Sequence, residues 1–308
     1  MSNLSVDLAG VKLKNPTILA SGIMGVSASS LKFVEENGAG AVTCKSIGPV
    51  DRRGHKNPTV IALENRIING VGLSNPGIDA EIEIIKEAQK RLTIPLIVSI
   101  FADTIDNFSV IAEKLLTVDP QIIELNLSCP NTEDDLGKMF ALDSESTKSV
   151  IHNVKKVTQG TNIKIFAKLT PEEEDFTKMG KVVEDAGADG ITTINTVLSM
   201  NIDIYSKKPL LANKYGGMSG PAIKPLGIES VYTLYKAVKI PIIGTGGILT
   251  GEDVIEYIMA GATAVGIGSG IYYRGIDIFN KVTKEIQTFM EREGFSSLEE
   301  MRGLAHKS

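Results

Sequence analysis

Cysteine and histidine are scarce in this sequence. The two cysteines, Cys44 and Cys129, are too few for a disulfide framework and do not form a CxxC metal motif. The three histidines, His55, His152 and His306, lie far apart and match no metal-ligand spacing. The sequence therefore predicts neither a protein-bound metal nor a fold held together by disulfides.

Basic stripes and long apolar runs are also missing. The chain has 37 acidic and 32 basic residues among 308, a formal net charge of −5, which argues against nucleic acid as a partner. No apolar run approaches the roughly 20 residues needed to cross a bilayer. The first residues, MSNLSVDLAGVKLKNP, have neither a signal peptide's apolar core nor an arginine-rich amphipathic helix. A cytoplasmic protein without membrane contact is expected.

What the chain does contain is an alternation of short β-branched runs with amphipathic helical stretches. Two such helices are expected in IDAEIEIIKEAQKRL and EDFTKMGKVVEDAG. A glycine follows the helix in ENGAGAVTCKS, DAGADGITTIN and MAGATAVGIGS, where a left-handed residue can satisfy the last carbonyls before a strand begins. The predicted strands are residues 17–21, 41–46, 96–101, 122–128, 163–169, 190–196, 240–244 and 264–268.

Eight strands joined by helices must run parallel and be covered on both faces, which explains their nearly continuous apolarity. Eight such units close into a (β/α)₈ TIM barrel, and we expect a single domain spanning residues 1–308. A doubly wound open sheet is the alternative, but its GxGxxG motif after the first strand is missing. In a barrel the active site lies at the carboxyl ends of the strands.

Those carboxyl ends are unusually polar, and Cys129 follows one of them. The last two strands end in IIGTGGI and GIGSGIY, where glycine N–H groups can approach an anion, as in the phosphate site of many barrels. These glycines could also serve only as tight turns. Because both relevant strand ends carry them, a phosphate-bearing ligand is favoured.

Two lysines stand inside otherwise apolar strands, Lys45 in TCKSI and Lys168 in IFAKLTP. A buried lysine is costly unless an anion accompanies it. One of the two could stabilise a reduced isoalloxazine and the other could bind an anionic substrate. Schiff-base chemistry is the competing use of such a lysine.

An ordered set of motifs resembles the class 1 dihydroorotate dehydrogenases. It comprises ILASGIMG, the Lys45-Ser46 pair, INGVGLSNPG, NLSCPN, FAKLTP, INT, GGMSGPAIKP, IPIIGTGGI and GIGSGIY, between residues 20 and 272. The resemblance implies a barrel that binds FMN and oxidises dihydroorotate to orotate in pyrimidine synthesis. Carried over position by position, the flavin contacts would be Ser21, Lys45, Ser46, Ser99, Asn126, Lys168, Ile194, Gly220, Gly246, Gly247, Gly268 and Ser269. The substrate contacts would be Lys45, Asn69, Val71, Gly72, Leu73, Asn126, Asn131, Asn195 and Thr196.

The resemblance also implies that Cys129 is the catalytic base, which removes the C5 proton while FMN N5 takes the C6 hydride. A thiol with a pKa near the reference value of about 8.5 is mostly protonated at neutral pH, so activity should rise with pH. The substrate ring alternates C=O and N–H groups. Asn69, Asn126, Asn131 and Asn195 suit it, because an amide both donates and accepts hydrogen bonds. Lys45 would bind the substrate carboxylate. Cys44, in contrast, is interpreted as an inert core residue.

One further expectation concerns the subclass, and three alternatives stay open. The segment after Asn131 lacks a Gly-Lys-Pro-Gln run and is more similar to the NAD-linked subclass, which implies a partner subunit carrying FAD and a 2Fe–2S cluster, in a homodimer or heterotetramer. A uracil or thymine reductase similar to dihydropyrimidine dehydrogenase would use the same barrel and thiol. A lysine-dependent aldolase or isomerase would use the phosphate site for its substrate, and a barrel serving only for assembly would bind flavin without turnover.

Overall fold

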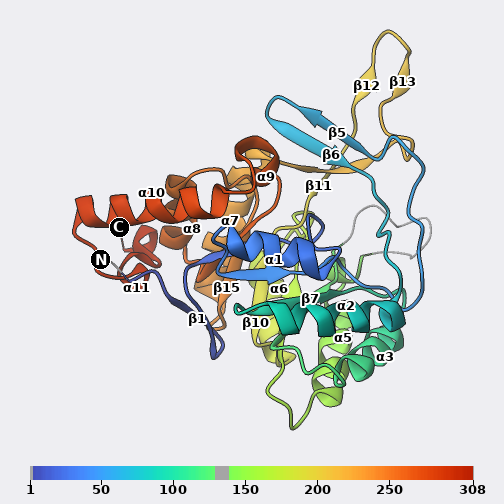
Figure 1. The fold of residues 1–308 in the computed structure, drawn as a ribbon, viewed down its shortest axis with the longest axis horizontal. Helices are drawn as coiled ribbons and strands as arrows, with labels where there is room; N and C mark the ends of the chain where they lie inside the picture. The colour runs from blue at the N-terminus through green and yellow to red at the C-terminus, as the bar shows by residue number, and fades with distance from the viewer. Residues whose placement is uncertain (1–2, 129–138, 308) are drawn as a thin grey trace.

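A closed parallel barrel forms the centre of the molecule (Figure 1). The computed structural model describes residues 3–128 and 139–307. Around the barrel the strands pair in chain order, and the last strand closes onto the first. The strands are β3 (Thr17–Leu19), β4 (Ala41–Thr43), β7 (Leu96–Ile100), β8 (Ile122–Asn126), β9 (Lys164–Lys168), β10 (Gly190–Thr193), β15 (Ile242–Thr245) and β16 (Ala264–Ile267). The predicted TIM barrel is confirmed, and each strand lies within one or two residues of its expected start.

Helices cover the outside of this barrel. The longer ones are α1 (Ala28–Glu36), α2 (Ile78–Arg91), α3 (Ile105–Leu115), α5 (Ser144–Val157), α6 (Phe176–Asp185), α7 (Lys224–Ala237), α8 (Gly251–Ala260) and α10 (Ile278–Glu293). The short ones are α9 (Gly270–Arg274), α11 (Leu298–Met301) and the 3₁₀ turns Phe140–Leu142, Pro221–Ile223 and Leu304–His306. Gly38, Gly187 and Gly261 follow α1, α6 and α8 with positive φ values of 103°, 92° and 124°, as the three glycine motifs predicted.

The amino end of the barrel interior is closed by apolar side chains. A two-stranded hairpin, β1 (Val6–Leu8) and β2 (Val11–Leu13), contributes to this cluster. Every barrel strand except β10 adds one side chain to this cluster. One of these side chains is Phe166, which is fully buried. The other members are Leu8, Val11, Leu13, Ile18, Ala41, Ile97, Ile122, Ile243 and Ala264. This end of the barrel is therefore a packed core rather than a pore.

A second, antiparallel sheet stands beyond the carboxyl end of the barrel, at the top of Figure 1. Its order is β11 (Val197–Ser199), β14 (Gly216–Ser219), β6 (Arg66–Asn69) and β5 (Val60–Leu63). A small hairpin, β12 (Ile202–Asp203) with β13 (Lys208–Pro209), extends it outward. The chain enters this sheet from the loops that follow β4 and β10, so the sheet lies on the side where the active site is expected. Within residues 3–128 and 139–307, no helix has the length and apolarity of a membrane span.

Candidate active site

A pocket of about 410 Å³ opens at the carboxyl end of the barrel, between the strand ends and the antiparallel sheet. Most residues that the sequence singled out line it. From the cofactor set these are Ser21, Lys45, Ser46, Asn126, Lys168, Ile194, Gly268 and Ser269. From the substrate set they are Asn69, Val71, Gly72, Leu73, Asn195 and Thr196, together with Lys45 and Asn126. One pocket therefore brings together both sets, although their contacts with a ligand stay predictions.

The remaining predicted residues lie elsewhere. Ser99 is fully buried behind the pocket wall. Gly246 and Gly247 form the turn after β15 with φ values of 131° and 69°, and a Cβ on Gly247 would come within 2.9 Å of the Gly220 carbonyl. Glycine is thus required at Gly247 by conformation and by close packing against Gly220. Cys129 and Asn131 lie outside the described residues.

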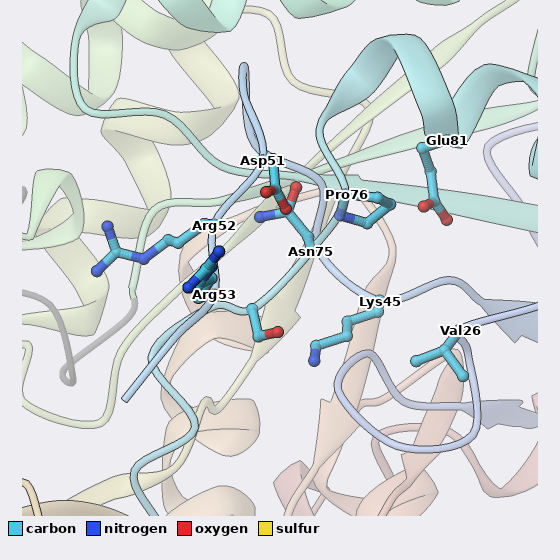
Figure 2. A pocket seen from close by; sticks show the side chains of 9 residues that line it. Val26, Lys45, Asp51, Arg52, Arg53, Asn75, Pro76 and Glu81 are labelled. Carbon is cyan, nitrogen blue, oxygen red and sulfur yellow. The ribbon is translucent and has the colours of Figure 1, made fainter. Parts of the chain in front are cut away.

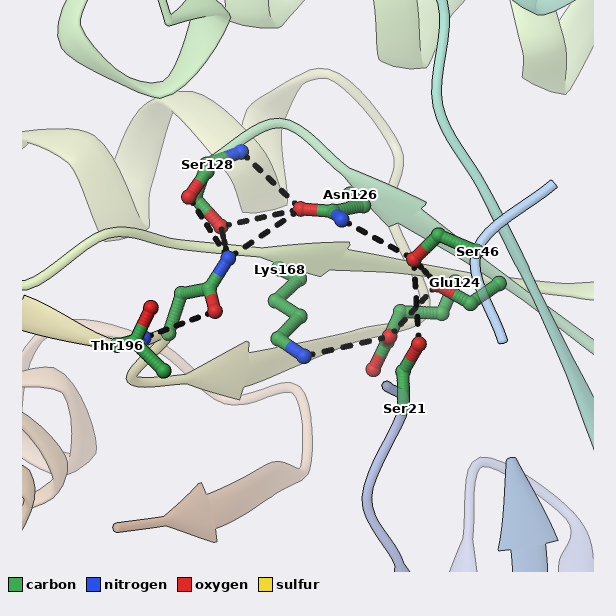
Figure 3. A network of polar contacts seen from close by, with 9 residues as sticks. Ser21, Ser46, Glu124, Asn126, Ser128, Lys168 and Thr196 are labelled. Carbon is green, nitrogen blue, oxygen red and sulfur yellow. Dashed lines mark hydrogen bonds and ion pairs between the residues drawn. The ribbon is translucent and has the colours of Figure 1, made fainter. Parts of the chain in front are cut away.

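A chain of hydroxyl groups runs behind one wall of the pocket (Figure 3). The Ser46 hydroxyl is hydrogen-bonded to Ser21 at 3.1 Å and to Ser99 at 2.9 Å, and it accepts a hydrogen bond from Asn126 Nδ2 at 3.1 Å. Ser99 in turn donates to Glu124 Oε1 at 3.1 Å. Because buried polar groups need partners, this network fixes side chains at the ends of four consecutive barrel strands, β3, β4, β7 and β8.

The predicted barrel lysine, Lys168, has a buried carboxylate beside it. Its Nζ atom lies 3.8 Å from Glu124 Oε1, and the two side chains are only 7% and 4% exposed. Glu124 was not among the predicted site residues. Its position in the run IIELN, two residues before Asn126 on the same face of β8, was the signal that could have identified it.

Two asparagines hold the backbone where β8 ends. Asn195 Nδ2 donates to the Ser128 carbonyl at 2.7 Å and lies 3.1 Å from the Ser128 hydroxyl, while its Oδ1 accepts from the Thr196 backbone N–H at 2.8 Å. Asn126 Oδ1 lies 3.5 Å from the same Nδ2 (Figure 3). Ser128, which directly precedes Cys129 in the chain, is therefore anchored at the edge of the pocket.

Lys45 faces a second pocket as well. This cavity, of about 430 Å³, is lined by Val26, Lys45, Asp51, Arg52, Arg53, Ser74, Asn75, Pro76 and Glu81 (Figure 2). Burial lowers the pKa of Lys45, and the negative charge of Glu81 opposes that effect. Burial raises the pKa of Glu81, in the first turn of α2, to about 7, although Lys45 opposes the shift. Lys45 lines both pockets and Glu81 lines the second one, and the two groups influence each other's pKa through their charges.

A family model for dihydroorotate dehydrogenase matches residues 3–290. The chain belongs to the dihydroorotate dehydrogenase family. A protein of Methanocaldococcus jannaschii named dihydroorotate dehydrogenase B (NAD(+)), catalytic subunit, is 47% identical over 308 residues, which cover 99% of this chain and 98% of that protein. Proteins with the same name from Pyrococcus horikoshii and Pyrococcus abyssi are 44% and 43% identical, and each comparison covers 98% or more of both chains.

Membership of the dihydroorotate dehydrogenase family confirms the predicted resemblance and the oxidoreductase class. It does not favour the uracil reductase or the lysine-dependent aldolase. The described residues contain no group of three or more His, Cys, Asp or Glu side chains placed to bind a metal ion.

Proposed function

We propose that the pocket at the carboxyl end of this barrel oxidises dihydroorotate to orotate in pyrimidine biosynthesis, in a single FMN-binding domain of residues 1–308. When bound, FMN supplies a hydride acceptor at N5. The observation that carries the proposal is one pocket lined by a buried lysine, strand-end glycines and three asparagines, in a chain of the dihydroorotate dehydrogenase family.

The residues at the pocket floor fit an anionic cofactor. The Lys168 ammonium is farther from Glu124 than a hydrogen bond, so it retains donors for a second acceptor. Thr245 also lines the pocket, and its buried Oγ1 has no hydrogen-bond partner among the described residues. Gly268 lines the pocket directly after β16, where its backbone N–H could approach an anion, whereas Gly246 and Gly247 lie in the buried turn after β15. Ser269 adds a hydroxyl there.

A second group of residues that line the pocket fits the substrate ring. Asn69, Asn126 and Asn195 each carry an amide that donates and accepts, and dihydroorotate alternates C=O and N–H groups in the same way. Lys45 would bind the carboxylate. An anionic substrate would favour its charged form and so offset the lowering of its pKa by burial. Val71, Gly72 and Leu73 would close the ring from the side of the antiparallel sheet, together with Thr196 and, by family likeness, Asn131.

Cys129 is the proposed base for the C5 proton. Its support is the family resemblance of NLSCPN and the anchoring of the preceding Ser128 by Asn195 at the pocket edge. A thiol of ordinary pKa is mostly protonated at neutral pH, so turnover should increase as the pH approaches about 8.5.

We further propose that this chain works in the cytoplasm with an electron-transfer subunit carrying FAD and a 2Fe–2S cluster, which passes electrons to NAD. The relatives' shared name, catalytic subunit of an NAD(+) enzyme, supports this proposal. The assembly would be a heterotetramer, and a homodimer is the alternative.

The visible spectrum of the purified chain, kept free of oxygen, tests the proposal before and after addition of dihydroorotate. We expect a yellow protein that bleaches with dihydroorotate and not with dihydrouracil, which has no carboxylate for Lys45. A yellow protein that bleaches with dihydrouracil instead would support the uracil reductase. A colourless protein that cannot take up FMN would overturn the flavoenzyme assignment.

A further inference from the structure

Glu124 is a buried carboxylate that the proposed reaction does not use. It lies near the middle of β8, where its neighbours across the sheet are Ser99 on β7 and Phe166 on β9. Its residue is 3% exposed, and it does not line the pocket. An ionised carboxylate in such a position is costly unless a positive charge and hydrogen bonds compensate it.

The structure supplies both forms of compensation. Lys168 Nζ lies 3.8 Å from Glu124 Oε1, and the Ser99 hydroxyl donates to the same oxygen at 3.1 Å. Lys168 lines the pocket and is level with Asn126 in the sheet, whereas Glu124 does not line it and is level with Phe166 of the apolar cluster; Figure 3 shows the contact between the two side chains. The order along the barrel axis is therefore pocket, ammonium, carboxylate and core.

We propose that Glu124 is a positioning residue that holds the Lys168 ammonium at the pocket floor and offsets part of its charge at the bound flavin. This inference rests on the proposed binding of FMN. A reduced flavin carries more negative charge than an oxidised one, so Lys168 alone would favour reduction. In a site that excludes water, a carboxylate next to that ammonium opposes the effect. Glu124 thereby lowers the reduction potential of the flavin, which favours the passage of electrons to an acceptor.

The test is the midpoint potential of FMN bound to the purified protein and to its Glu124→Gln variant. Glutamine keeps the size of the side chain and an oxygen that can accept from Ser99, but it removes the charge. We expect the ratio of reduced to oxidised FMN at a fixed potential to rise about tenfold, which for a two-electron couple is about 30 mV. Lys168→Gln should shift the potential in the opposite direction, and the double variant should lie between the two.

A matched control is Glu83→Gln, which removes an exposed carboxylate from α2 and should leave the potential unchanged. A purely structural role for Glu124 would not produce opposite shifts in the two single variants. An unchanged or lowered potential in Glu124→Gln would overturn the inference. If that variant fails to fold, recovery of folding by the double variant supports the charge pair, and failure to recover contradicts it.

These outcomes are separable from the fate of the proposed function. A wild-type chain that binds no FMN removes the proposed function itself. A wild-type chain that binds FMN and is bleached by dihydroorotate, with a potential that does not respond to Glu124→Gln, removes only the role of Glu124.

Discussion

The two ends of the barrel interior differ sharply although the same strands build both. At the amino end the inward side chains are apolar and tightly packed, and two residues further along β7, β8 and β9 they become polar. The pairs are Ile97 and Ser99 on β7, Ile122 and Glu124 on β8, and Phe166 and Lys168 on β9. Two residues of strand span only about 7 Å. One layer of side chains therefore separates the apolar core from the polar end where we propose that the reaction takes place.

The difference also appears in how the two ends meet their energetic requirements. The amino end needs only close packing, and a Cβ on Gly190 would overlap the Phe166 ring. The carboxyl end must provide partners for its buried polar groups, and the hydroxyl chain and the Lys168–Glu124 pair supply several of them. Thr245, which lines the pocket, has a buried Oγ1 without a hydrogen-bond partner among the described residues. Substitutions at the two ends should accordingly have different consequences.

The largest effect on activity is expected from Cys129→Ser. A serine hydroxyl is a much weaker base than a thiolate, so turnover near neutral pH should fall by about 10²- to 10⁴-fold. FMN content and the melting temperature should stay near the wild-type values. Stopped-flow bleaching of the flavin by dihydroorotate between pH 6 and 10 measures this directly.

Cys44→Ala is the control for that experiment. Cys44 is buried, and burial raises the pKa of its thiol, so it should contribute nothing to the rising limb of the pH profile. Its replacement should lower stability by about 1 kcal/mol and leave the pH profile unchanged. Wild-type turnover in Cys129→Ser would remove Cys129 from its role.

The largest effect on stability is expected at the amino end, from Phe166→Ala. Phe166 is fully buried in the apolar cluster, and truncation of such a ring usually costs about 3–5 kcal/mol through lost contacts and a residual cavity. Urea denaturation should show this loss, while the wavelength of flavin absorption stays unchanged below the midpoint. A large shift of the flavin spectrum at full occupancy would mean that the two ends are not independent.

Local signals in the sequence were sufficient for the barrel. The strands have nearly continuous apolar runs, and the glycines after α1, α6 and α8 take the left-handed conformation that their motifs required. Lys168 was expected to be a buried lysine because it stands inside an otherwise apolar strand, and it is buried and lines the pocket. Glu124 also stands among apolar residues, in IIELN, so the same reasoning would have predicted that it is buried.

Non-local features could not be predicted in this way. The antiparallel sheet pairs Asn69 with Gly217, residues far apart in sequence, through strands of three or four residues. Such short strands, partly polar and glycine-containing, have no distinctive pattern. Glu81 gave no signal either, because an acidic residue in the first turn of a helix normally faces solvent. In the structure it is 3% exposed and lines the same cavity as Lys45, which lies far from it in sequence.

A smaller effect, on stability, is expected from Glu81→Gln at the functional end. The pKa of Glu81 is raised by burial to about 7 from an ordinary value of 4.5. Between these values the unfolded chain is ionised while the folded chain keeps its proton, so wild-type stability falls as pH rises. Above pH 7 the penalty is constant. Glutamine removes it, so the variant should gain about 1–2 kcal/mol at pH 8 and little at pH 4.5.

Urea denaturation at the two pH values measures this difference, with the exposed Glu83→Gln as the control. The gain should be accompanied by a higher KM for dihydroorotate at alkaline pH, because Lys45 loses the negative charge that supports its ionised form. An equal change in stability at both pH values would show that titration of Glu81 is not its cause. The expected pattern would show that a buried group near the carboxyl end of the barrel lowers the stability of the fold, whereas the buried groups at the amino end raise it.

The smallest effect is expected from Tyr257→Phe, which tests how the outer layer supports the glycine turn. Tyr257 on α8 is fully buried, and its hydroxyl donates to the Gly246 carbonyl at 2.8 Å. A Cβ on Gly227 or Gly244 would overlap its side chain, so these two glycines make room for the ring. Phenylalanine keeps the ring but leaves the carbonyl without that donor. Because such a hydrogen bond contributes about 0.5–1.5 kcal/mol, FMN should bind about three- to tenfold more weakly.

Fluorescence titration of the apoprotein with FMN measures that affinity, with Tyr205→Phe as the control, because Tyr205 is 89% exposed on the outer hairpin. If FMN binds more weakly to Tyr257→Phe and not to Tyr205→Phe, a side chain of the surrounding helices contributes to FMN binding from outside the barrel interior. A lower melting temperature with unchanged FMN affinity would instead assign Tyr257 to packing. In that case the hydrogen bond to Gly246 stabilises the fold, and the conformation of the turn is set by Gly246 and Gly247 themselves.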